Sequence, residues 1–120
     1  MPHQHYKLSQ EQGVHVMELT LPIVVDPTDF DKLNEAVGDA TDSAGAERWV
    51  LDLRQVEYVG SALLGLLVNL RQRIKSAGGR LVLCGLSDQV SKALQTCSLH
   101  SLFTITPGRA DAVKSARLMR

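Results

Sequence analysis

The sequence has few of the residues that mark metal sites, disulfide frameworks or membrane spans. Its two cysteines, Cys84 and Cys97, share no CxxC motif and have no histidine at metal-ligand spacing, so we expect free, buried thiols. The first residues, MPHQHY, hold His3 and His5 but no apolar leader segment, and we interpret them as a solvated terminus. No stretch approaches the roughly 20 apolar residues of a membrane span. We therefore expect a cytoplasmic protein without metal or cofactor that does not insert into a membrane.

The charges of the chain cancel, which removes the electrostatic attraction that nucleic acids exert on basic proteins. Thirteen lysines and arginines balance thirteen aspartates and glutamates, and no run of like charges produces a local field. Hydrophobic residues make up 44% and charged residues 22% of the chain, which is enough for one ordinary core. No repeat or Pro/Gly/Ser-rich linker divides the sequence. We expect a single domain over residues 1–120 that binds no nucleic acid.

Strands and helices alternate in the hydrophobic pattern. Two short stretches joined near Gln12-Gly13 predict a hairpin, and helical spacing with cap and stop signals predicts the helices. Thr28 or Asp29 is the expected cap of the first helix, because either side chain can accept a backbone N–H. The expected strands span 6–9, 14–21, 49–53, 80–86 and 102–106; the expected helices run over 30–44, from 61 to the glycines at 78 and 79, from 88 through Cys97, and over 110–118.

Two of the strands are apolar along most of their length. WVLDL at Trp49–Leu53 and RLVLCGL at Arg80–Leu86 are typical of strands covered on both faces, so the first should lie inside the sheet rather than at its edge. A strand, an apolar helix and a second strand imply a right-handed parallel crossover. The expected fold class is α/β: a mixed four- to five-stranded sheet that begins with an antiparallel pair, with about four helices packed mainly on one side.

A lone serine, Ser61, stands where an alternating stretch ends and the apolar helix begins. A nucleophile elbow needs G-x-S-x-G, whereas this stretch reads GSALLG, and nothing in the sequence brings His15 or His100 to the serine as a base. Phosphate-cradling glycine motifs are absent as well. We therefore expect no enzyme. Two compatible roles stay open: a helix N-cap, worth about 1 kcal/mol, and a site where a charge is added and removed.

The apolar helix has two faces at 100° per residue. The first is wide enough to pack on the sheet and consists of Leu63, Leu66, Leu67, Leu70 and Ile74. The second consists of Ser61, Leu64, Gly65 and Val68, and it borders Arg71, Gln72 and Lys75. An apolar strip with a charged border is typical of a protein-contact surface. Periodicity alone fits equally well a face that a neighbouring helix covers, so both interpretations stay open.

The stretch WVLDLRQVEYVGSALLGLLVNLRQRIKSAGGRLVLCGL resembles the core motif of STAS domains, particularly the bacterial anti-sigma factor antagonists, and a looser likeness extends across nearly the whole chain. In that family a strand is followed by an aspartate-serine-serine/threonine-glycine-leucine-glycine turn, an apolar helix, a Gly-Gly turn and another strand. The family aspartate falls on Gly60, the phosphorylated serine on Ser61, the second hydroxyl residue on Ala62 and the first glycine on Leu63. The following Leu-Gly falls on Leu64 and Gly65.

The resemblance implies a STAS-like fold and a partner-switching function. Such an antagonist binds an anti-sigma factor, itself a serine kinase, while its serine is free, and releases it when the serine is phosphorylated. The implied phosphoacceptor is Ser61, and no catalytic, cofactor or metal residue is implied. The implied partner surface consists of Gly60, Ser61, Ala62, Leu64, Gly65, Val68 and Arg71. We expect a monomer or weak dimer. The alternative is a constitutive STAS interaction module of a lipid-transport ABC system or a signalling scaffold.

Overall fold

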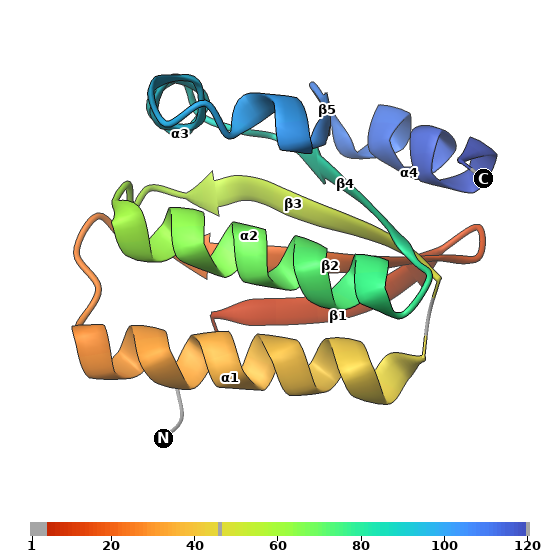
Figure 1. The fold of residues 1–120 in the computed structure, drawn as a ribbon, viewed down its shortest axis with the longest axis horizontal. Helices are drawn as coiled ribbons and strands as arrows, with labels where there is room; N and C mark the ends of the chain where they lie inside the picture. The colour runs from red at the N-terminus through yellow and green to blue at the C-terminus, as the bar shows by residue number, and fades with distance from the viewer. Residues whose placement is uncertain (1–4, 46, 120) are drawn as a thin grey trace.

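The structure is a computed structural model that describes residues 5–45 and 47–119. One five-stranded sheet, ordered β1-β2-β3-β4-β5, runs through the molecule (Figure 1). β1 pairs with β2 in antiparallel orientation, and the remaining neighbours are parallel, so the expected mixed sheet is confirmed. The strands are β1 (Tyr6–Glu11), β2 (Val14–Leu21), β3 (Arg48–Val56), β4 (Arg80–Cys84) and β5 (Thr104–Thr106).

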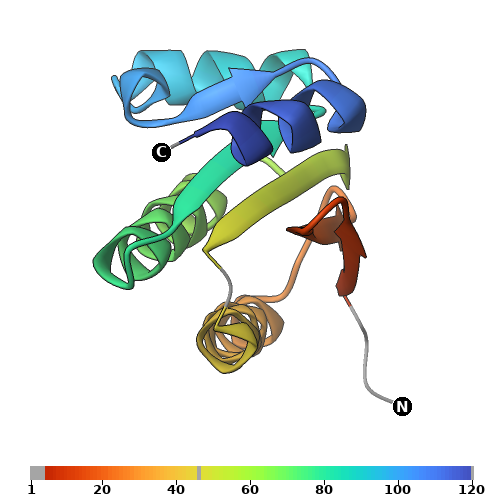
Figure 2. The same ribbon diagram turned by 90° about the vertical axis from the view of Figure 1, so that its right-hand side faces the viewer.

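Helices cover both faces of the sheet, but unequally. α1 and α2 lie on one face and α4 on the other (Figure 2), while α3 adds its buried residues to the same core as α1 and α2. The expectation of helices mainly on one side is therefore confirmed. No helix in the described ranges is long and apolar enough to cross a membrane. The helices are α1 (Pro27–Ala44), α2 (Ser61–Ser76), α3 (Asp88–Thr96) and α4 (Arg109–Leu118), and a 3-10 turn spans His100–Leu102.

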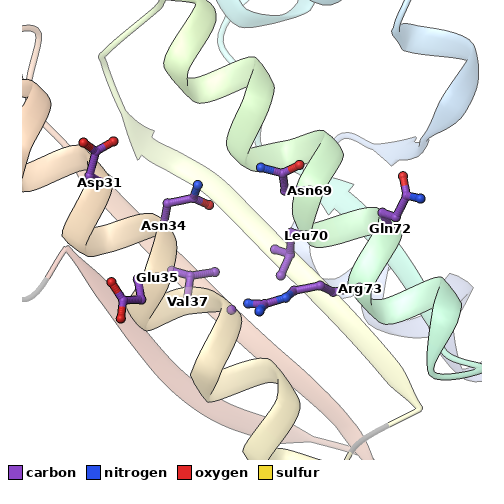
Figure 3. Close-up of a pocket in the computed structure, with 9 residues that line it drawn as sticks. Asp31, Asn34, Glu35, Val37, Asn69, Leu70, Gln72 and Arg73 are labelled. Carbon is purple, nitrogen blue, oxygen red and sulfur yellow. The ribbon is translucent and has the colours of Figure 1, made fainter.

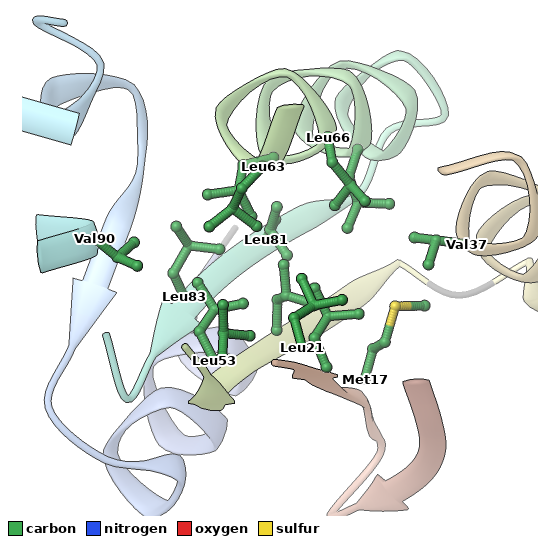
Figure 4. Close-up of a cluster of buried hydrophobic side chains, with 14 of the residues drawn as sticks. Met17, Leu21, Val37, Leu53, Leu63, Leu66, Leu81, Leu83 and Val90 are labelled. Atoms are coloured by element: carbon green, nitrogen blue, oxygen red, sulfur yellow. The ribbon is translucent and has the colours of Figure 1, made fainter. Parts of the chain in front are cut away.

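β3 is the central strand and is buried on both faces, as its apolar sequence predicts. Trp49 and Leu51 belong to the main core between the sheet and α1, α2 and α3, whereas Val50 points to the smaller core under α4. The main core contains leucines from six different elements, some of which Figure 4 shows, and those on α2 belong to the predicted core stripe. That stripe, Leu63, Leu66, Leu67, Leu70 and Ile74, is buried throughout.

The first helix begins three residues earlier than the sequence pattern predicts. Asp26 is its N-cap, and its carboxylate accepts a hydrogen bond from the Thr28 backbone N–H at 2.8 Å. Pro27 occupies the first turn, where its missing N–H removes no helical hydrogen bond. The prediction that Thr28 or Asp29 is the cap is therefore wrong. Asp29 instead lies in the first turn, where a negative charge suits the helix dipole.

The signals at Gly78 and Ser87 act as expected, whereas one of the two cysteines does not. Gly78, at φ +84°, adopts the left-handed conformation that ends α2, and Ser87 caps α3 by accepting from the Val90 N–H at 3.2 Å. Both thiols are free, and Cys84 is buried as predicted, but Cys97 is exposed. Cys97 is the C-cap residue of α3, so it lies beyond the buried face of that short helix.

Candidate functional site

The carboxyl ends of the parallel strands β2, β3 and β4 meet at one edge of the sheet, and three loops follow them at residues 22–26, 57–60 and 85–87. The first two loops are tied together, because the Glu57 N–H donates to the Leu21 carbonyl oxygen at 2.8 Å. Binding residues of open α/β sheets gather at such an edge. α2 begins directly after the second loop, which places Ser61 at this end of the molecule (Figure 1).

Ser61 is the first residue of α2 and is exposed. The N-cap position belongs to Gly60, whose carbonyl oxygen accepts from the N–H groups of Leu63 at 3.1 Å and Leu64 at 3.3 Å. No side chain caps this helix, so of the two roles left open for Ser61 the N-cap role is not the one that the structure shows. The serine lies one residue inside the helix. From there its hydroxyl accepts no hydrogen bond from the N–H groups of the first turn. Those N–H groups form a partial positive charge beside an exposed hydroxyl.

Gly60 has a specific packing reason to be a glycine. Its φ of 178° is extended backbone that any residue adopts, so conformation does not require it. A Cβ at this position, however, would lie 2.7 Å from the Tyr58 hydroxyl oxygen and 3.0 Å from the ring carbon that bears it. The Tyr58 ring is itself held against Phe30 of α1, with ring centroids 5.2 Å apart. Tyr58 therefore fills the space that a longer side chain at position 60 would need.

The second face of α2 is divided between open and half-buried residues. Ser61, Ala62 and Gly65 are exposed, whereas Leu64 and Val68 are half-buried and pack against the edge of the main core. Further along, the Arg71 Nε donates to the Leu102 carbonyl oxygen at 2.7 Å, so this side chain reaches toward the segment before β5. The first turn of α2 is thus the accessible part of the predicted partner surface, and the second turn is partly covered.

The sequence pattern did not predict three exposed apolar side chains that lie beside this edge. Ile23 is 69% exposed and Val24 81% exposed in the loop after β2, and Val59 is 40% exposed in the loop before α2. The sequence signal was available, because Pro22 and Pro27 flank the Ile23-Val24 pair and prevent a regular ladder from burying it. These residues and the start of α2 lie at the same edge of the sheet, and we call the set the switch surface: Ile23, Val24, Val59, Gly60, Ser61, Ala62, Leu64 and Gly65.

A cluster of ion pairs fastens α4 to the sheet. Asp52 on β3 is 2% exposed and accepts hydrogen bonds from the Arg109 Nε at 3.0 Å and from the Arg54 backbone N–H at 3.0 Å. Arg109, the first residue of α4, also contacts the carboxylates of Glu18 at 3.0 Å and Glu11 at 3.3 Å. Both oxygens of the buried Asp52 carboxylate therefore accept a hydrogen bond, and its negative charge is paired with the Arg109 guanidinium, as a stable buried carboxylate requires. We assign this cluster to the structure of the domain.

The thiol of Cys84, which lies near this cluster, is unreactive mainly because it is buried. Burial, followed by the nearby Asp52 carboxylate, raises the pKa of the Cys84 thiol to about 12. Burial lowers the pKa of Arg109, but its hydrogen bond and charge interaction with Asp52 outweigh burial and the pKa is raised overall. Because the thiolate is the nucleophilic form, Cys84 remains an inert core residue at neutral pH.

A polar groove of about 420 Å³ lies between α1 and α2 (Figure 3). Asp31, Asn34 and Glu35 line it from α1, and the Arg73 side chain crosses it from α2. The Arg73 guanidinium lies so close to Gly38 that any side chain there would collide with it, and it pairs with an α1 carboxylate. We interpret this groove as the polar seam that joins the two helices.

Among the residues that the structure describes, no group of three or more histidines, cysteines and carboxylates is arranged so that it could hold a metal ion. His3 lies outside the described residues. The His5 Nδ1 lies 3.1 Å from the Thr20 carbonyl oxygen, which ties this ring to β2.

The comparisons with known proteins agree with this architecture. The sequence pattern of the STAS domain matches residues 6–112. A putative anti-sigma factor antagonist of Bordetella bronchiseptica, BtrV, is 26% identical over 106 residues, which cover 88% of this chain and 90% of that protein. The match therefore spans nearly the full length of both proteins.

Solved structures share the fold at low sequence identity. A STAS domain protein from Planctomyces limnophilus superposes with a TM-score of 0.79 at 23% identity and covers 93% of this chain and 97% of its own. The anti-sigma factor antagonist SpoIIAA of Bacillus, in its unphosphorylated form, gives a TM-score of 0.75 at 16% identity over 96% of this chain and 98% of its own. The expected mixed sheet with four helices is thus the fold of known antagonists.

Proposed function

We propose that this chain, which belongs to the STAS domain family, is an anti-sigma factor antagonist that binds an anti-sigma factor kinase through the switch surface. The observation that carries the proposal is the exposed hydroxyl of Ser61 at the start of α2, which lies at the same loop edge of the sheet as the exposed side chains of Ile23, Val24 and Val59. Apolar exposure of this extent at a sheet edge favours a protein partner over a small substrate.

Phosphorylation of Ser61 would control this binding by charge. A phosphoserine carries about −1.5 to −2 charge at pH 7 and adds three acceptor oxygens. At the first position of α2 the group would meet the positive end of the helix dipole, so the fold would tolerate it. Val59 is exposed and Leu64 is half-buried near Ser61, and a partner that covers these side chains would require the phosphate to lose water. The modified domain would therefore stay folded and release its partner.

A constitutive interaction module is the second candidate, and the turn before α2 favours it. Gly60 and Ala62 stand where the family motif carries a carboxylate and a second hydroxyl, and Tyr58 occupies the space next to Gly60. A kinase that recognises those missing groups would find fewer contacts on this turn. In this case the same surface binds a transport or scaffold subunit permanently, and Ser61 is never modified.

Phosphorylation separates the two candidates. The protein is incubated with ATP and an anti-sigma factor kinase from the same organism, and phosphate is located by mass spectrometry. The antagonist function predicts phosphate on Ser61, its loss in Ser61→Ala, and its retention in the matched variant Ser76→Ala at the other end of α2. A stable complex with the unmodified protein, with no phosphate on Ser61, assigns the chain to the constitutive class.

The apolar part of the switch surface is tested by two aspartate substitutions at equally exposed positions. Ile23 and Leu118 are exposed to the same extent, 69% and 70%, but Leu118 lies at the end of α4. Ile23→Asp should weaken binding of the kinase by at least roughly tenfold, the order expected when an interface anchor is lost. Leu118→Asp should leave the affinity unchanged. Equal effects of the two variants would remove the loop after β2 from the interface.

A further inference from the structure

β1 forms one outer edge of the sheet (Figure 2). Within the described part of the chain, β2 is the only strand that pairs with it, and its middle residues, 7–10, are exposed. The opposite edge strand, β5, has three residues, whereas β1 has six. An unpaired edge presents main-chain donors and acceptors to any strand that can lie beside it. β1 is therefore the longer of the two edges at which another strand could pair.

The pairing with β2 determines which main-chain groups of β1 point outward. The turn of the hairpin, at residues 12 and 13, has φ values of 53° and 81°, as in a two-residue turn of type I′, which bonds Glu11 to Val14. At the other end, the Thr20 N–H donates to the His5 carbonyl oxygen at 2.7 Å. Bonded and unbonded pairs alternate along an antiparallel ladder. The odd-numbered residues of β1 therefore bond to β2, and the N–H and C=O groups of its even-numbered residues point away from the sheet.

The outward groups limit the registers in which a second copy of β1 can pair in antiparallel orientation. A donor that points outward must meet an acceptor that points outward, so even-numbered residues must face even-numbered residues. Two twofold-symmetric registers satisfy this rule and keep five residues of each strand in the ladder. One has its axis at Leu8 and spans residues 6–10, and the other has its axis at Ser9 and spans residues 7–11. In the second register, Leu8 and Gln10 exchange hydrogen bonds across the axis.

Charge distinguishes the two registers. With the axis at Ser9, Lys7 of each copy lies opposite Glu11 of the other, in an unbonded pair whose Cα atoms are about 4.5 Å apart. Opposite charges that face each other in this way stabilise a strand pair. With the axis at Leu8, Lys7 faces Ser9 instead, and no strand residue lies opposite Glu11. Only the register centred on Ser9 therefore forms two symmetric ion pairs.

Both charges lie on the face of the sheet that α4 covers, and both can take a further partner. Glu11 contacts Arg109 of α4 at 3.3 Å and is still 41% exposed. Arg109 also serves the carboxylates of Glu18 and Asp52, so carboxylates outnumber cations in this cluster. Lys7 lies on the same face because it is four residues from Glu11 along the strand. It is exposed and makes no ion pair with any described residue.

We propose that β1 pairs with β1 of a second copy of this chain, antiparallel about a twofold axis at Ser9, and joins the two five-stranded sheets into one. The main-chain groups of Leu8 and Gln10 form the hydrogen bonds, and Lys7 and Glu11 form the ion pairs. A charged residue on an edge strand normally prevents pairing with other strands. Here the glutamate four residues after the lysine turns that charge into a contact that selects an identical strand.

Sedimentation equilibrium of the full chain measures the association. One strand edge covers less surface than a stable interface needs, so the dimer should be weak, with a dissociation constant below about 1 mM, and it should weaken further at higher salt. A mass that stays that of the single chain at about 1 mM protein would overturn the proposal. In the dimer, an isotope-filtered NOE should join the Hα atoms of Ser9 in the two copies. A contact between Lys7 and Ser9 would place the axis at Leu8 and overturn the ion pairs.

Reversal of the two charges tests the ion pairs. Lys7→Glu and Glu11→Lys each place like charges opposite one another on both sides of the axis, so each variant alone should dimerise roughly tenfold or more weakly. An equimolar mixture of the two should regain the dimer, because the opposite changes then face each other. Lys92→Glu, at an exposed lysine of α3, should leave the dimer unchanged, and thermal unfolding checks that each variant is folded. A mixture that associates no more tightly than either variant alone would overturn the ion pairs.

A proline tests the main-chain part of the contact. The Gln10 N–H points away from β2, so a proline at this position removes no hydrogen bond within the sheet, as at other edge strands. Gln10→Pro should abolish the dimer and leave the fold intact. Gln10→Ala, which keeps the N–H, should retain the dimer. Equal dimerisation of these two variants would overturn the pairing through this edge.

The outcome is independent of the proposed antagonist function, because β1 contributes no residue to the switch surface. The monomeric Gln10→Pro variant should bind an anti-sigma factor kinase with the same affinity as Gln10→Ala. If neither variant binds the kinase while Gln10→Ala still dimerises, the antagonist function fails and the dimer stands. If both bind the kinase and neither Gln10→Ala nor the wild type dimerises, the dimer fails and the antagonist function stands.

Discussion

Gly60→Asp should change the free energy of unfolding by different amounts in two backgrounds that differ only at Tyr58. In a Tyr58→Leu background the space beside position 60 is open. An aspartate there gains roughly 0.4–1 kcal/mol by restricting the unfolded chain, and an aspartate N-cap exceeds a glycine N-cap by about a few tenths of a kcal/mol. We therefore expect Gly60→Asp to stabilise the Tyr58→Leu protein by about 1 kcal/mol.

In the wild-type background the same substitution must displace a ring. A Cβ at position 60 would lie 2.7 Å from the Tyr58 hydroxyl oxygen, and the ring can move only by leaving Phe30. A tilted aromatic pair contributes about 0.5–1.5 kcal/mol beyond its buried area, which offsets the gain at the cap. Gly60→Asp should then leave the free energy of unfolding nearly unchanged, which gives a coupling energy of about 1 kcal/mol between the two positions.

The assay is urea unfolding followed by the fluorescence of Trp49, the single tryptophan of the sequence, which is 2% exposed when folded. Midpoints are compared for the four proteins of the cycle at constant slope. Equal shifts on Gly60→Asp with and without the Tyr58 ring would refute the reasoning, because the ring would then not be what excludes a side chain at position 60.

Two further predictions concern the ion-pair cluster and the thiols. Asp52→Asn should lower the free energy of unfolding by about 2–3 kcal/mol, because a charged hydrogen bond to a buried group is lost. Glu11→Gln, at the exposed end of the cluster, should lower it by less than about 1 kcal/mol. Equal urea midpoints of the two variants would contradict this. In a maleimide reaction followed by mass spectrometry at pH 8, Cys97 should be modified and Cys84 should not, because the pKa of Cys84 is about 12 and its thiolate forms only far above that pH. Modification of both thiols in the folded protein would contradict the buried environment.

Long-range hydrophobic patterning made the fold predictable. The leucine stripe of α2 and the apolar run at Trp49–Leu53 each favour one arrangement, a helix packed on a sheet that contains a central buried strand, and both are confirmed. Gly78 was predictable for a local reason, since the end of a helix needs a left-handed residue. These features depend on periodicity or on single-residue conformation, which the sequence carries directly.

Features set by one-residue shifts or by distant pairing were not predictable in the same way. Asp26, Thr28 and Asp29 all have side chains that can cap a helix. Asp26 is the cap in the structure because Pro27, which follows it, suits the first turn of the helix. The helix α2 starts after Gly60 rather than after Ser61, which changes the serine from a cap to an exposed hydroxyl. Asp52 and Arg109 are 57 positions apart, so only the fold brings them together.

The exposed Ile23-Val24 pair shows a different limit. Two β-branched residues so soon after a strand normally indicate that the strand continues, and only Pro22 before them and Pro27 after them oppose that interpretation. The helical pattern predicted the first turn of α2 as a contact surface, but the neighbouring loop could be added to this proposal only after the fold placed the three strand ends at one edge. The local pattern therefore predicted one part of the proposed switch surface, and topology supplied the rest.

The central claim is that charge at Ser61 controls partner binding, and Ser61→Asp against Ser61→Asn tests it most directly. The two side chains have nearly the same shape and differ in one negative charge. Affinity for an anti-sigma factor kinase is measured by calorimetry, with thermal unfolding of each variant as the folding control. The account predicts that Ser61→Asn binds the kinase with close to the wild-type affinity. Ser61→Asp should stay folded and bind at least roughly tenfold more weakly, because like-charged or desolvated groups at an interface cost more than about 1 kcal/mol. Equal, wild-type affinity of both variants would contradict the charge mechanism.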